Sequence, residues 1–157
     1  MNFPSLAELP VFRAHALAPK VAALAFPLVQ LACPNIDLQA WMVYVRAQAN
    51  VRRGTGGVTA VEDERGYIHC VFSWNLIGHL TCRKSLRISD LVMAHLPGRA
   101  LQDAVLAEIQ ALAECTGAGA IVVEAGANIG GLRRGVLIAR GFKPAGEWFE
   151  MVRRAAS

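Results

Sequence analysis

The stretch from His95 to Ala100, which reads HLPGRA, places a glycine in a turn that leads directly into an amphipathic segment. The first N–H groups of a helix have no partners within it, and the helix dipole makes that end positive. Such a turn can bind a phosphate through its backbone, or it can be an ordinary connection between a strand and a helix. Gly98, Arg99 and Ala100 are therefore candidate anion-binding residues, and Arg99 can add a charged donor.

Two carboxylates lie in the apolar segments on either side of that helix. Asp90 alternates with apolar residues such as Ile88 and Val92, so we expect it to lie on a buried face. A buried charge is costly unless it is paired. Glu124 closes the apolar run that follows the helix. A carboxylate in a cleft is a candidate general base; the alternative for both residues is a structural hydrogen bond to a loop or a helix cap.

Histidine and cysteine offer weaker candidates. His69 and His79 could act as bases, although a single histidine more often has a core or surface role. The four cysteines are Cys33, Cys70, Cys82 and Cys115. They form no CxxC pair and their spacing fits no zinc site, so we expect no metal. Reduced, buried thiols are typical of cytoplasmic proteins, and the predicted localisation is cytoplasmic.

The first third of the chain is predicted to be helical. Residues 1–16 look irregular because they carry two prolines. A helix is predicted over 19–33, since Pro19 suits a first helical position. A second helix is predicted over roughly 36–50, with Asn35 as its cap.

In the middle third of the chain, the residue pattern changes from helical to strand-like. Residues 58–63, 67–77 and 79–93 are rich in β-branched and aromatic residues and are separated by short turns. This pattern predicts three strands in an antiparallel meander.

The last third indicates a βαβ unit. Helical periodicity is clearest over 100–116, and the β-branched run at 120–125 predicts a strand buried on both faces. A weak helix over 129–140 and a last strand over 146–154 follow. We therefore expect one α/β domain over 1–157, with an α+β mixed sheet in which the meander precedes the βαβ unit and helices cover both faces.

This order of elements resembles the GNAT superfamily of N-acetyltransferases. In that family a strand-to-helix loop reading Gln/Arg-x-x-Gly-x-Gly/Ala binds the pyrophosphate of acetyl-coenzyme A through its backbone. Gly98 and Ala100 fit the loop, His95 stands at the Gln/Arg position, and Pro97 removes one N–H donor. A second match is EAGANIGGLRRGVLIARGF, in which Asn128 and the final Gly-Phe fit the end of a strand and the end of the next helix.

The chain also departs from the family pattern. The family often has a tyrosine four residues before the Gly-Phe glycine, and it protonates the departing thiolate; Leu137 stands there. Tyr44 and Tyr67 are the only tyrosines, and both are distant in sequence. Alignment on the strand ISDLVM leaves the loop a few residues short, whereas alignment on HLPGRA spoils the strand register.

The resemblance implies transfer of an acetyl group from acetyl-coenzyme A, as cosubstrate, to a small-molecule or peptide amine. Asp90 or Glu124 would then be the general base. The residues implied in coenzyme binding, including backbone donors to the thioester oxygen, are Leu91, Val92, Met93, Gly98, Arg99, Ala100, Asn128 and Arg133.

The alternative is a non-catalytic GNAT-like fold that acts as an interaction, regulatory or acyl-ligand-binding module. Leu137, Pro97 and the glycines of the last helix favour it. An open gap between 86–93 and 120–125 would favour the enzyme. Side chains such as Trp74 or Met93 filling that gap would favour the binding module.

The composition of the chain limits the kinds of partner that we expect it to bind. The net charge is +4 without a lysine- or arginine-rich run, so nucleic acid is not an expected partner. No apolar stretch reaches the roughly 20 residues that a membrane helix needs. The chain is 54% hydrophobic and only 18% charged, which is compatible with a homodimer surface.

Overall fold

The computed structural model describes the chain except residues 1–9, 53, 81–82, 125–131, 133 and 145–157. Its centre is a five-stranded sheet in the order β1-β2-β3-β4-β5. The first four strands pair antiparallel, and β5 pairs parallel to β4. The strands are β1 (Arg13–Ala16), β2 (Gly56–Glu62), β3 (Ile68–His79), β4 (Arg83–Met93) and β5 (Ala120–Val123).

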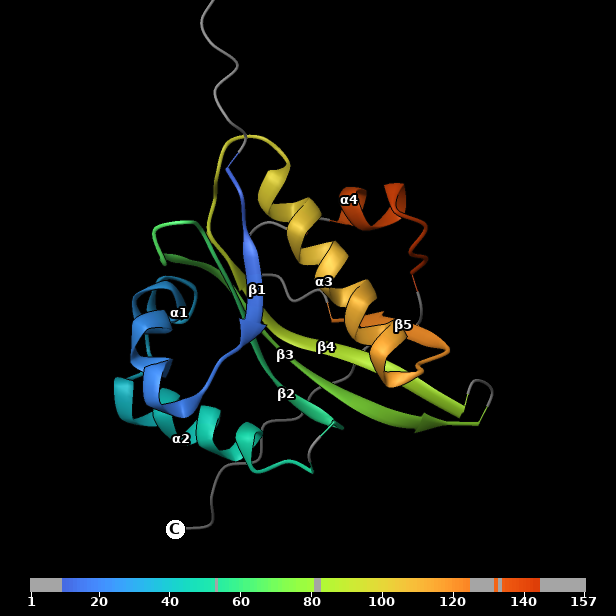
Figure 1. The fold of residues 1–157 in the computed structure, drawn as a ribbon, viewed down its shortest axis with the longest axis horizontal. Helices are drawn as coiled ribbons and strands as arrows, with labels where there is room; N and C mark the ends of the chain where they lie inside the picture. The colour runs from blue at the N-terminus through green and yellow to red at the C-terminus, as the bar shows by residue number, and fades with distance from the viewer. Residues whose placement is uncertain (1–9, 53, 81–82, 125–131, 133, 145–157) are drawn as a thin grey trace, which may run out of the picture.

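Helices cover both faces of this sheet (Figure 1). They are the 3₁₀ helix η1 (Pro19–Ala25), α1 (Phe26–Ala32), α2 (Leu38–Ala49), α3 (Ala100–Thr116) and α4 (Arg134–Ala139). One face carries η1, α1 and α2, and the other carries α3 and α4. Among the described residues, no helix has the length and apolar character needed to cross a membrane.

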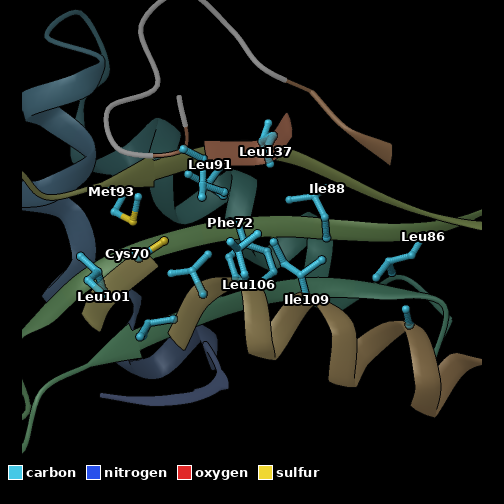
Figure 2. Close-up of a cluster of buried hydrophobic side chains, with 14 residues drawn as sticks. Cys70, Phe72, Leu86, Ile88, Leu91, Met93, Leu101, Leu106, Ile109 and Leu137 are labelled. Carbon is cyan, nitrogen blue, oxygen red and sulfur yellow. The ribbon is translucent and has the colours of Figure 1, made fainter. Parts of the chain in front are cut away.

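The α3 face holds the larger core cluster. Figure 2 shows Phe72 beside Leu106 and Ile109 of α3, and the same cluster includes Ile88 and Leu91 of β4. Ile109 and Val105 are fully buried, as the predicted stripe of that helix requires. The helix ends at Gly117, whose φ of +68° is the left-handed cap that glycine accepts without strain.

The second cluster lies under η1, α1 and α2. Trp41 and Val45 of α2 pack against Val58 and Val71 of the sheet. The helix begins after Asp37, whose carboxylate accepts a hydrogen bond from the N–H of Ala40 at 2.7 Å. The predicted cap at Asn35 is therefore wrong, because the carboxylate two residues later caps the helix.

The predicted meander and βαβ unit are confirmed, with three local corrections. Residues 13–16, predicted to be irregular, form the edge strand β1, which pairs with β2. The first half of the predicted helix 19–33 is the 3₁₀ helix η1. Strand β5 is only partly buried and Val122 is 38% exposed, so the prediction of burial on both faces is wrong. The predicted last strand over 146–154 lies outside the described residues.

Candidate active site

A β-bulge in β4 shapes the candidate site. Val92 pairs with Val71 and Ser89 pairs with Ser73, so β4 carries one more residue than β3 over this interval. Asp90 takes up the extra length with a φ of +49°, a left-handed conformation that Asp tolerates better than most residues.

The bulge reverses which side chains face α3. Ile88 before the bulge and Leu91 after it both belong to the α3 cluster (Figure 2). Strict alternation would have placed Asp90 there instead. The prediction that Asp90 is buried on the face of Ile88 is therefore wrong: its side chain is exposed and lies on the side of α1 and α2.

Tyr44 of α2 reaches this carboxylate. Its hydroxyl donates a hydrogen bond to Oδ2 of Asp90 at 2.8 Å. Burial is the largest cause and raises the pKa of Tyr44 well above its usual range; a hydrogen bond with Ser73 opposes it, and the charge and hydrogen bond of Asp90 raise the pKa by smaller amounts. The hydroxyl is therefore protonated at physiological pH and remains a donor.

Two serines hold the strands together beside the bulge. The Ser73 hydroxyl lies 2.9 Å from that of Ser89 and donates to the Ser89 carbonyl at 3.1 Å. Ser73 is 5% exposed, so this is a buried polar contact between β3 and β4. It fixes the pairing immediately before the bulge.

A first cavity, of about 230 Å³, opens over the bulge. Its walls come from α1, α2, β2, β3 and β4, and are mostly aliphatic or aromatic. The polar side chains among its described lining are Tyr44, Ser73 and Asp90, with the thiol of Cys33 at one wall. We call this the bulge cavity.

A second cavity, of about 510 Å³, lies where β4 leads into α3. Residues 93–98 form its wall together with the first turn of α3 and Val136 of α4. Gly98 has a φ of +82°, and a Cβ built there would meet nothing within 4 Å. Arg99 is the N-cap position and its side chain does not cap the helix. We call this the loop cavity.

The strands β4 and β5 stop pairing next to the bulge. The parallel register runs from Ser85 opposite Ala120 to Ile88 opposite Val123. The N–H of Glu124 then donates to the Ile88 carbonyl at 2.9 Å. From the bulge onward, β4 has no β5 partner among the described residues.

Trp74 and Met93 are the two side chains expected to fill the gap between β4 and β5 in a binding module, and the residues that follow Glu124 along this gap lie outside the described part of the chain. Trp74 and Met93 belong to, or pack against, the α3 cluster, and Met93 also borders the loop cavity. Neither lines the bulge cavity. Trp74 and Met93 therefore leave the bulge cavity on the α1–α2 side unfilled, and whether a gap opens between β4 and β5 stays a prediction.

The second predicted base has a different environment. The carboxylate of Glu124 forms an ion pair with the guanidinium of Arg87 on β4. Both side chains are about a third exposed, at 27% and 30%. The pair joins the middle of β4 to the residue that follows β5, so Glu124 lies near the bulge but already has a cationic partner.

The histidines predicted as further candidate bases lie away from the bulge cavity. His69 forms a 2.9 Å contact with Asp63 in the β2–β3 hairpin and packs edge-on against Phe12. The side chain of His79, like residues Asn128 and Arg133, lies outside what the structure describes.

Leu137 occupies the position where the family pattern has a tyrosine. It is 8% exposed and belongs to the α3 cluster with Leu91 (Figure 2). An apolar side chain here completes the core. No proton donor stands at this position.

Tyr44 is the residue that the sequence did not reveal. It is separated from Asp90 by 46 residues and sits on a helix whose apolar stripe predicts packing alone. Its offset of three residues from Trp41, which puts both on one helix face, is the signal that could have placed it above the sheet.

Comparison with known proteins identifies the fold. No family model and no curated protein matches the sequence. Among solved structures, an aminoglycoside N-acetyltransferase in complex with coenzyme A aligns with a TM-score of 0.76 at 8% identity, covering 96% of this chain and 100% of that one.

Two further structures give the same result. Glucosamine-6-phosphate N-acetyltransferase from Arabidopsis thaliana has a TM-score of 0.70 at 12% identity, over 90% of this chain and 98% of that one. A predicted acetyltransferase from Clostridium acetobutylicum, with acetyl-coenzyme A, has a TM-score of 0.67 at 17% identity, over 90% and 96%. The chain therefore has the fold of the GNAT acetyltransferases, at low sequence identity to these structures.

Proposed function

We propose that this protein is an N-acetyltransferase that moves the acetyl group of acetyl-coenzyme A to an amine. The observation that carries the proposal is the β4 bulge. It brings a carboxylate and a tyrosine hydroxyl into a cavity at the point where β4 and β5 stop pairing. The GNAT fold and the coenzyme complexes of the similar structures support the same assignment.

The coenzyme pyrophosphate would bind in the loop cavity. The loop cavity borders the first turn of α3, whose first N–H groups have no partner within the helix and whose dipole favours an anion. Gly98 lines this cavity, and the neighbouring residues Arg99, which is exposed, and Ala100 complete the turn that would bind the phosphate. Pro97 offers no N–H, so fewer backbone donors remain than in the family loop. Asn128 and Arg133 remain predicted coenzyme-binding residues.

The thioester carbonyl would lie along β4 after the bulge. The N–H of Ala94 donates to His69 of β3 at 2.7 Å. Because backbone groups alternate sides along a strand, the N–H groups of Met93 and Leu91 point away from β3. Either one can donate to the oxyanion that forms as the amine attacks. The N–H of Val92 points toward β3, and Val92 contributes to the wall of the bulge cavity.

Asp90 is the proposed base. A neutral amine attacks the thioester carbon, the N–C bond forms, and the C–S bond breaks to release coenzyme A. The acceptor arrives as an ammonium ion, and Asp90 accepts its proton directly or through a water. Tyr44 orients the Asp90 carboxylate by its hydrogen bond. Glu124, held by Arg87, is assigned to strand positioning.

Leu137 leaves the thiolate without a tyrosine donor, so in this scheme the second proton that the attacking nitrogen loses passes through a water molecule to the thiolate. Most of the rate enhancement then comes from holding the two substrates together. Leu137 also favours the second candidate function, a GNAT-like module that binds an acyl coenzyme without turning it over.

One experiment separates the two functions. The full chain is incubated with acetyl-coenzyme A and a panel of primary amines, and the released thiol is measured. Amine-dependent release above the rate without amine is the expected result. If coenzyme binding is saturable but no amine in the panel increases thiol release, the acetyltransferase proposal is overturned and the binding module is supported.

A further inference from the structure

We propose that the acceptor is a compact apolar monoamine, meaning one ammonium group on a small aliphatic or aromatic body. This inference rests on the proposed function and specifies its substrate class. It is drawn from the walls, the charges and the size of the bulge cavity.

The walls of the bulge cavity suit an apolar body. Side chains of Val29, Ile36, Val58 and Val92 line it from three elements and the segment between α1 and α2. Trp41 is 4% exposed, and its indole N–H already donates to the Ala22 carbonyl at 2.8 Å. The indole therefore presents only apolar surface to a ligand.

An aromatic pair continues this surface toward the carboxylate. The rings of Trp41 and Tyr44 stack with centroids 5.8 Å apart and planes inclined by 18°. At the end of this stacked pair, the Tyr44 hydroxyl donates its hydrogen bond to Asp90. A ligand that lies along the rings thus meets apolar surface first and one anionic group at its end.

The charges point to a single ammonium. Asp90 is the one charged side chain among the described residues that line the bulge cavity. A polyamine or an aminoglycoside would leave its additional ammonium groups against aliphatic walls, which is unfavourable without partners. A phosphorylated amino sugar would find no lysine or arginine among the same described residues.

The size sets the last limit. The cavity measures about 230 Å³, below the range of about 300–1,000 Å³ that is usual for drug-sized ligands. An oligosaccharide would extend well outside it. A branched alkylamine or a single aromatic ring with a short amine arm matches this space.

The first test compares acceptors on the full-length wild-type chain. Isoamylamine and benzylamine are compared with spermidine, kanamycin and glucosamine 6-phosphate by amine-dependent thiol release. We expect kcat/KM for the two monoamines to exceed that for each of the others by at least tenfold. Equal or better turnover of a polycation or of the phosphorylated sugar overturns the inference and leaves the acetyltransferase assignment intact.

A matched pair of variants tests the wall directly. Ile36→Glu adds a second carboxylate to the cavity, and we expect it to shift preference from isoamylamine toward 1,5-diaminopentane. Leu31→Glu adds the same charge at a residue that is 82% exposed and does not line the cavity. It should leave the preference unchanged. A shift in both variants, or in neither while both remain folded by circular dichroism, contradicts the proposed role of the wall.

Binding without turnover separates this inference from the proposed function. Calorimetry of benzylamine with wild type and Asp90→Asn needs no coenzyme. Saturable binding that Asp90→Asn weakens at least tenfold supports the apolar monoamine site, even where acetyl-coenzyme A fails to bind and the acetyltransferase assignment falls. Absence of both benzylamine binding and monoamine turnover refutes the inference.

Discussion

The bulge cavity and the loop cavity border the same strand but are built in different ways. The bulge cavity, of about 230 Å³, is defined by side chains from five elements and contains one carboxylate. The loop cavity, of about 510 Å³, is defined largely by one continuous segment and the start of α3. A site formed by one contiguous loop can bind the constant part of a substrate, and a site formed by side chains from several elements can select the variable part. The difference matches a common coenzyme and a specific acceptor.

The largest expected effect comes from Asp90→Asn, which removes the proposed base from the bulge cavity. Asn keeps the size of the side chain and tolerates the left-handed backbone. We expect kcat to fall by roughly 10²–10⁴-fold, the usual contribution of a general base, with coenzyme affinity unchanged. Steady-state thiol release and coenzyme calorimetry measure the two effects.

Asp63→Asn is the control for that variant. Asp63 is bonded to His69 in the β2–β3 hairpin and lines neither cavity. It should retain wild-type kcat. An equal loss of activity in both variants would mean that overall charge, and not the bulge, governs turnover.

The next effect concerns the partner of Asp90. Tyr44→Phe removes one hydrogen bond to a carboxylate and keeps the ring that stacks on Trp41. Because hydrogen bonds to charged groups contribute about 1.5–3 kcal/mol, we expect kcat/KM for the amine to fall by at least about tenfold. Coenzyme affinity should stay constant. If Tyr44→Phe instead weakened only coenzyme binding, Tyr44 would belong to the coenzyme site and not to the acceptor site.

The loop cavity has its own matched pair, Gly98→Ala and Gly66→Ala. Both glycines have strongly positive φ, +82° and +84°, and neither has a neighbour within 4 Å of an added Cβ. Each substitution should therefore cost about 1–2 kcal/mol of stability through backbone strain alone. Only Gly98→Ala should also weaken coenzyme binding. Denaturant unfolding and calorimetry test this, and equal coenzyme affinity in the two variants would show the loop to be a plain turn.

The smallest effect lies outside both cavities. The hydrogen bond from His69, with help from the backbone N–H groups of Tyr67 and Arg65, lowers the pKa of Asp63 below its usual value of 3.8. A lowered folded-state pKa stabilises the protein above the unfolded value, and that stability is lost as pH falls through the folded value. Wild type should lose slightly more stability than Asp63→Asn between pH 6 and pH 3. Urea midpoints at the two pH values measure it; identical losses would show that the Asp63–His69 contact adds no pH-dependent stability.

Local periodicity explains which elements were predictable. The stripe of α3 and its terminating Gly117 predicted Ala100–Thr116 residue for residue, because propensity, packing and cap agree there. The three meander strands followed from their β-branched and aromatic content. Strand β1 was not predicted because it spans only Arg13–Ala16 at a sheet edge. So short a segment shows no alternation of apolar and polar residues.

The candidate site depended on a feature that has no periodic signal. One additional residue in β4 exchanges the faces of Asp90 and Leu91, and sequence alternation alone places the carboxylate in the wrong layer. The Tyr44–Asp90 hydrogen bond depends on that inversion and on how α2 lies over the sheet. The loop of Gly98, by contrast, is contiguous in sequence, so its residue types alone suggest an anion-binding turn.

Thermal unfolding of the full chain with acetyl-coenzyme A tests the central claim most directly, with coenzyme A and ATP as controls. Ligand at about 100 times its Kd adds roughly 2.7 kcal/mol, which for a chain of this size raises Tm by about 5–10 °C. We predict that shift with both coenzyme forms and not with ATP. No shift at millimolar acetyl-coenzyme A, or an equal shift with ATP, would contradict the proposed coenzyme site.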